Sequence, residues 1–461
     1  MSFKLSIDKF EEELSNKSPI FLIDHSSLYF VNLKFYSYSL TSTSIALILR
    51  FPEFNCEWDE KYFGDLFSIK NGLNKGKDYF GHGTPILNYM DVNQNVYNSE
   101  DNVKGCVEVT PEEIDKYGVN NNDLFLTRTS ETSDEIGLTS TYQGNNSETV
   151  FSGFILRARP YKLNIIDSLF YAYYLRTSNM RNNIIKYSSI TTRALINSSN
   201  LSKIKVKLPS IEEQEKIASF LLDIDQKIEL LHDKKEEFIE FKHYLLQNLF
   251  PRNDELTPKL RFNKYHDDWD GYTLSDIGDC YNGLSGMKKE DFSNGDSKYI
   301  TYKTIFDNVK IDVSSLEYVN LNDKKQNLVK KDDLFFTGSS ETPEETGMVS
   351  VLENNVSDCY LNSFCFGYRL NDTLKFNSIF LGYYFRNPFM RKILTILSQG
   401  STRFNLSKKE VLKIRITIPS TDEQEKIASF LSFVDKKIDL LDQEIELVEE
   451  YKKGLLQKMF I

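Results

Sequence analysis

Two long stretches of the chain repeat apolar residues at alternating steps of four and three. The second has one polar member in the series, Lys452, and the first has two, Lys235 and Lys242. A sustained period of 3.5 residues is typical of a coiled coil. The pattern predicts one helix over residues 210–250 and another over 420–461, each about 60 Å long at 1.5 Å per residue. The predicted helix-pairing positions are Ile217, Leu221, Ile224, Ile228, Leu231, Ile427, Leu431, Val434, Ile438 and Leu441.

The starts of both predicted helices carry the same signals. Pro209 and Pro419 prevent extension of the helix backwards. The segments Ser210 to Glu213 and Ser420 to Glu423 each fit the S-x-x-E capping box. Two amphipathic helices packed separately on their own domains are the alternative. We favour mutual pairing, because a narrow apolar seam surrounded by charge matches a broad globular face poorly.

The chain also repeats its own sequence. The run E-E-Q-E-K-I-A-S-F at 212–220 recurs at 422–430 as D-E-Q-E-K-I-A-S-F, 210 residues later. At the same spacing, D-L-F-L-T-R-T-S-E-T at 123–132 matches D-L-F-F-T-G-S-S-E-T at 333–342. Near the start of each copy the spacing is 211, and the matched groups there are Arg50-Phe51 with Arg261-Phe262, Trp58 with Trp269, and Asn71-Gly72-Leu73 with Asn282-Gly283-Leu284. The chain is therefore a tandem duplication of about 200 residues.

The remainder of each copy is predicted to mix strands and helices. Strand-like runs at 123–127 and 333–337 are bounded by Gly, Asn and Asp. Helical stretches are expected near 165–185 and 378–397. In the first of them Tyr171, Tyr173 and Tyr174 have helical spacing and are predicted to be core residues.

Residues 1–49 have no counterpart in the second copy. They contain strand-like, aromatic runs at 20–23 and 28–33. Lys4 and Lys9 precede an acidic run instead of an apolar one, which argues against a secretory signal. No stretch approaches the ~20 apolar residues of a membrane span, so we expect a cytoplasmic protein without a membrane partner.

Composition sets further limits. With 461 residues, 40% hydrophobic and 13% aromatic, the chain is expected to form two to four domains with buried cores. The net charge of −11 argues at first against nucleic acid. Residues 211–250 hold ten acidic and five Lys side chains and residues 421–461 hold ten and six, so the two helices carry −5 and −4 of that charge. The remaining chain is close to neutral, and local Lys and Arg patches remain able to contact phosphate.

Catalytic and metal-binding signals are weak. The five cysteines and five histidines lack zinc or triad spacing, so we expect reduced structural thiols and no metal site. Asn387-Pro388-Phe389 is similar to the Asn-Pro-Pro-Tyr/Phe motif of amino-methyltransferases but lacks the second proline. Phe80-Gly81-His82-Gly83 is followed by Pro85 and is predicted to be a turn. No Walker-type phosphate loop is present.

The duplicated domain and its E-Q-E-K-I-A-S-F-L helix resemble the specificity subunit of type I restriction–modification systems. The resemblance covers about residues 50–461. The motifs that carry it are L-P-S-I-E-E-Q-E-K-I-A-S-F-L-L-D-I-D-Q-K-I at 208–228, I-P-S-T-D-E-Q-E-K-I-A-S-F-L-S-F-V-D-K-K-I at 418–438, the Arg-Phe…Trp entries and the Leu-Leu-Gln-x-hydrophobic-Phe helix ends. The extension at residues 1–49 departs from the family pattern, which has only a short lead.

The resemblance implies an α+β chain with two tandem α/β target recognition domains separated by two long antiparallel coiled-coil helices. The expected segments are an atypical N-terminal extension (1–49), the first target recognition domain (50–209), the central helix (210–250), a linker with the second target recognition domain (251–419) and the C-terminal helix (420–461).

The resemblance also implies partners and chemistry. Each domain would read half of a split site in double-stranded DNA. Two modification subunits would bind, supply S-adenosylmethionine and methylate adenine N6, and restriction subunits would add an ATP-dependent nuclease that needs Mg. This chain would hold no cofactor. Two alternatives stay open: a self-contained methyltransferase or nuclease, and a coiled-coil scaffold without sequence preference.

The two copies differ where DNA readers are expected to differ. After the shared D-L-F strand the first copy has Arg128, where the second has Gly338. An arginine that binds guanine O6 and N7 contributes about 1–3 kcal/mol of discrimination, so the half-sites should differ. The alternative is an ion pair of Arg128 with Glu131 or Asp134 on a solvated turn.

Further candidate contacts lie in lysine-bearing loops and in hydroxyl–arginine turns. A lysine in a Gly-rich loop suits phosphate contact, although ordinary surface lysines look the same. All candidate DNA-binding residues are Lys75, Lys77, Thr127, Arg128, Thr129, Ser130, Thr192, Arg193, Lys288, Lys289, Gly338, Ser339, Ser340, Gln399, Thr402 and Arg403.

Overall fold

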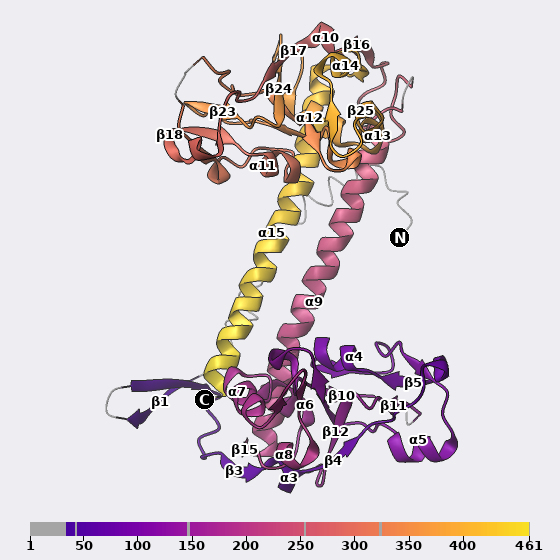
Figure 1. The fold of residues 1–461 in the computed structure, drawn as a ribbon, viewed down its shortest axis with the longest axis vertical. Coiled ribbons are helices and arrows are strands. Elements are labelled where there is room, and N and C mark those ends of the chain that lie inside the picture. Colours follow the sequence, from indigo (N-terminus) through magenta and orange to yellow (C-terminus); the bar gives the residue numbers. More distant parts are fainter. Residues whose placement is uncertain (1–33, 42–43, 145–147, 253–254, 322–324, 461) are drawn as a thin grey trace. The chain divides into compact units, whose positions relative to one another are not determined.

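The computed structural model describes residues 34–41, 44–144, 148–252, 255–321 and 325–460 (Figure 1). The chain divides into two compact units. The first-repeat unit contains the described residues of 34–232 and 444–460, and the second-repeat unit contains those of 233–443. Each unit thus joins one repeat domain to the start of its own long helix and to the end of the other long helix. The strand-like runs expected at 20–23 and 28–33 lie outside the described residues.

The first repeat domain is built on a five-stranded sheet in the order β4-β12-β8-β10-β6 (Figure 1). Its strands pair antiparallel except β10 with β6, which are parallel. The strands are β4 (Phe67–Asn71), β6 (Tyr97–Asn98), β8 (Leu124–Thr127), β10 (Thr139–Tyr142) and β12 (Ile155–Pro160). Smaller sheets are formed by β11 (Val150–Phe151), β5 (Phe80–Leu87) and β7 (Cys106–Val107); by β13 (Ser189–Ile190), β14 (Ala194–Leu195) and β9 (Thr129–Ser130); and by β15 (Lys205–Leu208) and β3 (Asp59–Tyr62). The hairpin of β1 (Lys34–Thr41) and β2 (Ser44–Arg50) belongs to the N-terminal extension.

The second repeat domain follows the same plan, with a sheet in the order β17-β24-β20-β22. These strands are β17 (Gly278–Asn282), β20 (Leu334–Thr337), β22 (Val349–Val351) and β24 (Cys365–Leu370). The smaller sheets are formed by β19 (Glu317–Val319), β18 (Phe292–Ile300) and β23 (Cys359–Leu361); by β21 (Ser339–Ser340), β26 (Phe404–Leu406) and β25 (Ser398–Gln399); and by β16 (Asp270–Thr273) and β27 (Arg415–Ile418). The strands predicted at 123–127 and 333–337 are confirmed as β8 and β20.

Short helices complete both domains. In the first they are α3 (Phe63–Leu66), α4 (Tyr89–Gln94), α5 (Pro111–Tyr117), α6 (Ser168–Tyr174), α7 (Ser178–Lys186) and α8 (Ser198–Leu201), with the 3-10 turns η1 (Lys77–Tyr79) and η2 (Ser133–Glu135). In the second they are α10 (Leu274–Ile277), α11 (Tyr302–Asp307), α12 (Ser378–Arg386), α13 (Pro388–Leu397) and α14 (Lys408–Leu412), with η3 (Lys289–Asp291), η4 (Val313–Ser315) and η5 (Pro343–Glu345).

The helical stretches expected near 165–185 and 378–397 are each two helices instead of one. In the second copy Asn387 ends α12 and caps α13, and Pro388 occupies the first turn of α13. Proline has no N–H to donate to the preceding turn, so it begins a helix and does not continue one. Tyr171, Tyr173 and Tyr174 are at most 4% exposed, which confirms them as core residues.

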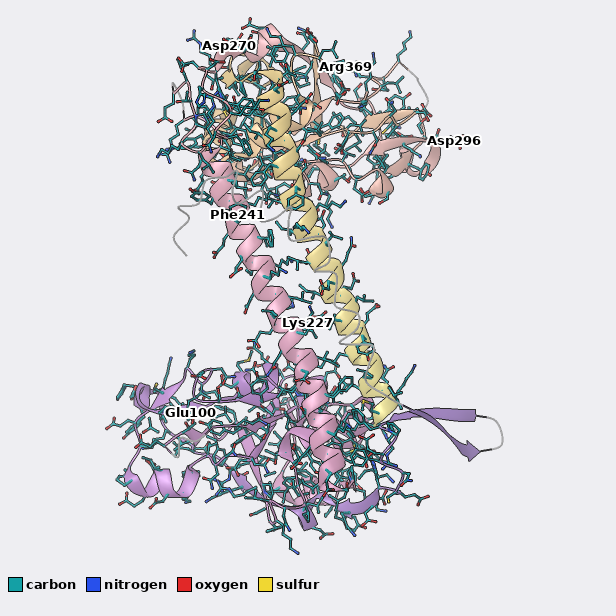
Figure 2. All side chains as sticks on the ribbon, turned by 180° about the vertical axis from the view of Figure 1, so that it is seen from behind. Glu100, Lys227, Phe241, Asp270, Asp296 and Arg369 are labelled. Carbon is teal, nitrogen blue, oxygen red and sulfur yellow. The ribbon has the colours of Figure 1, made fainter. Side chains whose placement is uncertain are left out.

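Each repeat ends in a single long helix, α9 (Ile211–Asn248) or α15 (Thr421–Met459). In the second-repeat unit, Lys235 pairs with Asp442 and Lys242 with Asp435. From the first pair to the second, the position moves seven residues forward on α9, from 235 to 242, and seven back on α15, from 442 to 435. This is the register of an antiparallel pair. In the first-repeat unit, Lys227 (labelled in Figure 2) lies 3.1 Å from Glu444.

All three lysines that interrupt the apolar series pair with an acidic residue on the other helix. In the first-repeat unit Lys452 bonds to Asp225, and Asp225 also accepts from the Tyr173 hydroxyl at 2.7 Å. The residues 210 positions away repeat this in the second-repeat unit, where Lys242 and Tyr383 meet Asp435 at 2.6 and 2.7 Å. Burial and then the negative charge of Asp435 raise the pKa of the Tyr383 phenol, which therefore stays a donor.

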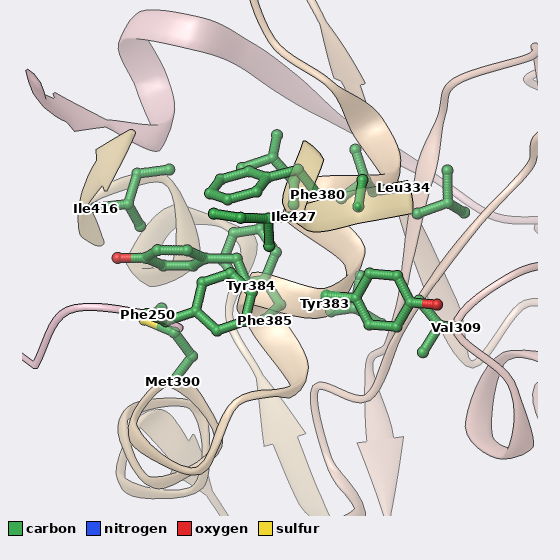
Figure 3. Packing of buried hydrophobic residues seen from close by; sticks show 14 of the residues in the cluster. Phe250, Val309, Leu334, Phe380, Tyr383, Tyr384, Phe385, Met390, Ile416 and Ile427 are labelled. Carbon is green, nitrogen blue, oxygen red and sulfur yellow. The ribbon is translucent and has the colours of Figure 1, made fainter. Parts of the chain in front are cut away.

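The predicted helix-pairing residues lie on the inner side of the two helices. Ile228 and Ile438 are half-buried, and the other eight are at most 6% exposed. In the second-repeat unit, Ile427, Leu431 and Val434 share one core with the end of α9 and with α12. Figure 3 shows part of this core, where Phe250 meets Tyr384 with ring centroids 5.4 Å apart. The start of the seam therefore packs against the repeat domain as well as against the partner helix.

Candidate nucleic-acid interface

The structure brings two of the candidate segments together in a small three-stranded sheet. In the first repeat domain, β9 (Thr129–Ser130) pairs with β14 (Ala194–Leu195), and β14 pairs with β13. Thr192 and Arg193 form the exposed turn between β13 and β14. These segments are more than sixty residues apart in the sequence, yet they share one surface.

The second repeat domain builds the same small sheet. Here β21 (Ser339–Ser340) pairs with β26, and β26 pairs with β25. Gln399 lies in β25, and Thr402 and Arg403 lie in the exposed turn that follows it. The Arg403 guanidinium stacks on the ring of Phe364, 5.2 Å from its centroid.

The position that differs most between the copies has the same backbone contacts in both. The Arg128 N–H donates to Phe154 O at 2.9 Å, and Arg128 O accepts from Ile196 N at 3.0 Å. Gly338 forms the same two bonds in the second copy: its N–H donates to Phe364 O at 2.8 Å, and its oxygen accepts from Leu406 N at 2.9 Å. The fold therefore holds the position in place whichever residue occupies it.

The Arg128 side chain is half-buried and bonds to the turn that precedes β12. Its Nη1 donates to Gly153 O at 3.3 Å, and its Nε is buried without a hydrogen-bond partner among the described residues. Glu131 lies 3.7 Å from Arg193 instead, in an exposed pair. Among the described residues, Arg128 forms no ion pair with Glu131 or Asp134, so that alternative is not supported.

Three candidate hydroxyls are buried and bonded inside the protein. Thr127 donates to Glu135 O at 2.5 Å and accepts from Leu138 N at 2.9 Å. Ser130 donates to the Glu135 carboxylate at 2.9 Å, and Ser340 donates to that of Glu345 at 2.7 Å. Because these side chains hold the turn after the central strand, the more accessible Thr129, Ser339 and neighbouring turns are better placed to meet a ligand.

The four lysine candidates fall into two groups. Lys75 is 13% exposed, pairs with Glu113 at 2.7 Å and lies over the Tyr79 ring. Its bond to Glu113 is the main cause that lowers the pKa of that carboxyl, so Lys75 is committed within the protein. Lys77, Lys288 and Lys289 are exposed in or beside the turns η1 and η3.

A groove of about 410 Å³ opens beside the small sheet of the first repeat domain. Its rim includes Phe154, whose side chain is 61% exposed. The matching Phe364 is 51% exposed. Neither was singled out from the sequence, although both follow a polar turn at the repeat spacing of 210 residues. The groove is lined by Tyr89, Thr129, Ser130, Glu131, Thr132, Glu135, Phe154 and Arg193.

The motifs shared by the copies serve to fasten each domain to its helix. Glu213 receives two hydrogen bonds from Arg50, at 2.5 and 2.6 Å, and Glu423 receives two from Arg261, both at 2.8 Å. The predicted capping boxes are thus half formed at most: Ser210 Oγ caps Glu213 N at 3.3 Å, but the Glu213 carboxylate binds arginine. An arginine fork outcompetes a single backbone N–H for a carboxylate.

Tyr173-Tyr174-Leu175-Arg176 recurs 210 residues later as Tyr383-Tyr384-Phe385-Arg386, and the arginine of each run is also structural. Arg176 donates to the backbone oxygens of Thr139, Val92, Asn93 and Asn95. In the second copy Arg386 donates to the equivalent oxygens of Val349, Ile305, Phe306 and Asn308. Burial lowers the pKa of both arginines to about 10. The two guanidinium groups bind the carbonyl oxygens at the C-terminal ends of α4 and α11, so their N–H groups stabilise the fold.

The sequence signals for catalysis have structural explanations where the residues are described. Phe80 to Gly83, predicted to be a turn, begin strand β5 instead, so that prediction is wrong. Asn387 is fully buried and caps α13 through Phe389 N and Met390 N. Burial raises the pKa of the Cys280 and Cys365 thiols to about 12, which keeps them protonated and unreactive. Among the described residues no group of three or more His, Cys, Asp or Glu is placed to hold a metal ion. The described part of the chain also contains no helix that is long and apolar enough to cross a bilayer.

A family model described as the type I restriction modification DNA specificity domain matches residues 55–240 and, a second time, residues 266–450. This chain belongs to that family. It is built as a specificity subunit with two target recognition domains. The putative type I restriction enzyme MjaX specificity subunit of Methanocaldococcus jannaschii is 25% identical over 417 residues, which are 87% of this chain and 92% of the relative. The MjaVIII specificity subunit of the same organism is 23% identical over 431 residues, 88% and 92% of the two chains.

Solved structures agree with the specificity-subunit fold. The S subunit of a type I restriction–modification system from M. genitalium aligns with a TM-score of 0.52 and 16% identity, over 89% of this chain and 98% of that one. A chain from a study of complex assembly and conformational transition in the type I R-M system aligns with a TM-score of 0.53 and 13% identity, over 88% and 98%. We refer below to the first and second recognition domains.

Proposed function

We propose that each recognition domain reads one half of an asymmetric, bipartite site in double-stranded DNA. The observation that carries this is the pair of small sheets. They share their backbone contacts and differ in their exposed side chains, as two readers of different half-sites require. Direct readout needs such side chains at base edges, and phosphate contacts from Lys77, Lys288 and Lys289 would fix the register.

The spacing between the half-sites is proposed to depend on the long helices. Helices α9 and α15 have 38 and 39 residues, so each extends over about 57–59 Å. Major-groove faces of DNA recur every 34–36 Å, about 10–10.5 base pairs. Insertion of one base pair into the unread spacer of a cognate site is expected to abolish specific binding. Unchanged affinity would refute this role of the helices.

The chemistry is proposed to come from other subunits. Two modification subunits would bind this chain, hold S-adenosylmethionine and methylate adenine N6, and restriction subunits with ATP and Mg would complete the complex in the cytoplasm. The capping role of Asn387 and the burial of the Cys280 and Cys365 thiols support a non-catalytic chain. Calorimetry of the purified chain with S-adenosylmethionine should give no binding heat, and a saturable heat would indicate a self-contained methyltransferase.

One experiment tests the whole proposal. Methylome sequencing of a host that carries this chain with its modification subunit should give a split motif, with two different half-sites and a fixed spacer. A contiguous motif would contradict bipartite reading. Absence of any motif, with the complex shown to assemble, would favour a scaffold without sequence preference.

A further inference from the structure

One cross-strand row of each small sheet presents its side chains on the accessible side. In the first recognition domain the row consists of Thr129, Leu195 and Ser189, which are direct partners across β9, β14 and β13. Directly paired residues of antiparallel strands point to the same face. Ser189 is exposed and the other two are half-buried. In the other row Ala194 and Ser130 are buried, and only its edge residue Ile190 is exposed. The row therefore lies on the outer face of the sheet.

The second recognition domain has the corresponding row with different chemistry. Ser339, Asn405 and Gln399 are direct partners across β21, β26 and β25. Asn405 and Gln399 are exposed and Ser339 is half-buried. Relative to the first domain, Leu is replaced by Asn and Ser by Gln at the repeat spacing of 210 residues. We call the two sets the reading rows.

The scaffold around the reading rows is the same in both domains. The backbone bonds of Arg128 and Gly338 to neighbouring segments hold the starts of β9 and β21, and a serine–glutamate bond lies beside each. The two small sheets thus have the same backbone bonds but different exposed side chains. A residue set that determines which bases are bound needs this arrangement. In each small sheet two strands, β13 with β14 or β25 with β26, form a hairpin. The major groove, about 12 Å wide, admits a two-stranded ribbon of this kind.

The donor and acceptor groups of the second row match the edge of one base, adenine. Asn405 Nδ2 donates to Arg403 O at 3.2 Å, so part of that amide is used within the turn. Gln399 is exposed in the two-residue strand β25, so its amide is placed to offer both a donor and an acceptor. A glutamine amide matches adenine, which offers N7 as acceptor and the N6 amino group as donor. The first row presents Leu195 and the Thr129 methyl, which match the methyl group of thymine.

We propose that the reading rows determine one base pair in each half-site, with Gln399 reading adenine in the second and Leu195 with Thr129 contacting thymine in the first. This rests on the proposed function, because it assigns the readout residues of that same interface. It goes further by naming the base class and the residue that recognises it.

The test uses the complete complex of the full-length chain with its modification subunits and a DNA library randomised in both half-sites. Gln399→Ser installs the residue of the first row. It should reduce the preference for adenine at one position of the second half-site by roughly 5- to 150-fold. Gln399→Glu changes only the amide to a carboxylate, which accepts but does not donate. It should move the preference from adenine towards cytosine, whose N4 amino group donates.

The first half-site, read by the same molecule, is the internal control, and its selected sequence should not change. Lys392→Ala, a change on α13 outside the small sheet, should leave every base preference as it is. If the wild-type complex selects a split motif but both Gln399 variants select the same second half-site, the reading rows are not the determinant and the proposed function still stands. A uniform loss of affinity without a changed base also overturns the assignment. If the wild-type complex selects no motif, the proposed function itself fails.

Discussion

Asp123 in the first recognition domain and Asp333 in the second receive the same fork of two hydrogen bonds, from Arg159 and Arg369 respectively (Figure 2 labels Arg369). A few residues further along, the Arg128 side chain bonds to Gly153 in the turn before β12, whereas Gly338 has no side chain to form such a bond. The two domains thus agree in their buried polar contacts and differ on the small sheet. The two copies therefore share the contacts that hold each domain together and differ on the surface that we propose meets DNA.

The largest expected effect comes from the contacts that both copies share. Glu213→Ala would leave Arg50, whose side chain is 11% exposed, without its carboxylate partner. Loss of one member of a buried ion pair costs about 3–5 kcal/mol. Urea unfolding should show this loss for Glu213→Ala and a similar one for Glu423→Ala. The exposed Glu215→Ala is the control and should change stability by no more than about 0.5 kcal/mol.

The shared contacts between the helices should be weaker but still equal in the two copies. Asp225→Ala and Asp435→Ala each remove the acceptor of one lysine and one tyrosine. We expect each to cost about 1–3 kcal/mol in thermal or urea unfolding, because hydrogen bonds to charged groups are worth more than neutral ones. A loss in only one of the two variants would contradict the structural equivalence of the copies.

Exposed lysines should affect DNA binding without changing which bases are chosen. Lys77→Ala and Lys289→Ala are expected to weaken binding of the assembled complex to all sequences alike. Each should lower the slope of log affinity against log salt by about one, since each phosphate contact releases about one counterion. A changed base preference in a selection assay would instead place that lysine at a base edge.

The smallest effect is expected where the copies differ within the helix seam. Lys235 pairs with Asp442, whose side chain is 53% exposed, while the position 210 residues later is the buried Ile445. Lys235→Ile should change the free energy of unfolding by no more than about 0.5 kcal/mol, because an ion pair whose side chains are 26% and 53% exposed contributes little. A loss above about 2 kcal/mol would show that this asymmetric pair sets the register.

The sequence was sufficient for the features that extend over many residues. Both long helices begin within one residue of their predicted starts, since a heptad pattern over about 40 positions is hard to mistake. The internal repeat predicted the equivalence of the two domains, and the strands β8 and β20 followed from their apolar runs.

The small sheets could not be predicted from the sequence, because they depend on contacts that no local pattern encodes. Strands such as β9 and β13 have two residues, too few for an alternation of apolar and polar positions to appear. The exposed Phe154 has the residue type of a core position, and only the tertiary fold directs it outward. The Glu213 carboxylate was assigned to a helix cap because its partner Arg50 lies 163 residues away in the sequence.

The most direct measurement replaces residues 261–419 with a second copy of residues 50–209 and leaves both long helices unchanged. Because the arginine–glutamate fork and the Tyr173–Asp225 contact have direct counterparts in the other repeat, the chain should fold and assemble with its partner subunits. Methylome sequencing should then give a split motif with the first half-site on both sides of the spacer. If the original second half-site persisted, base reading would not reside in the recognition domains, and their assignment as the readers of DNA sequence would be wrong.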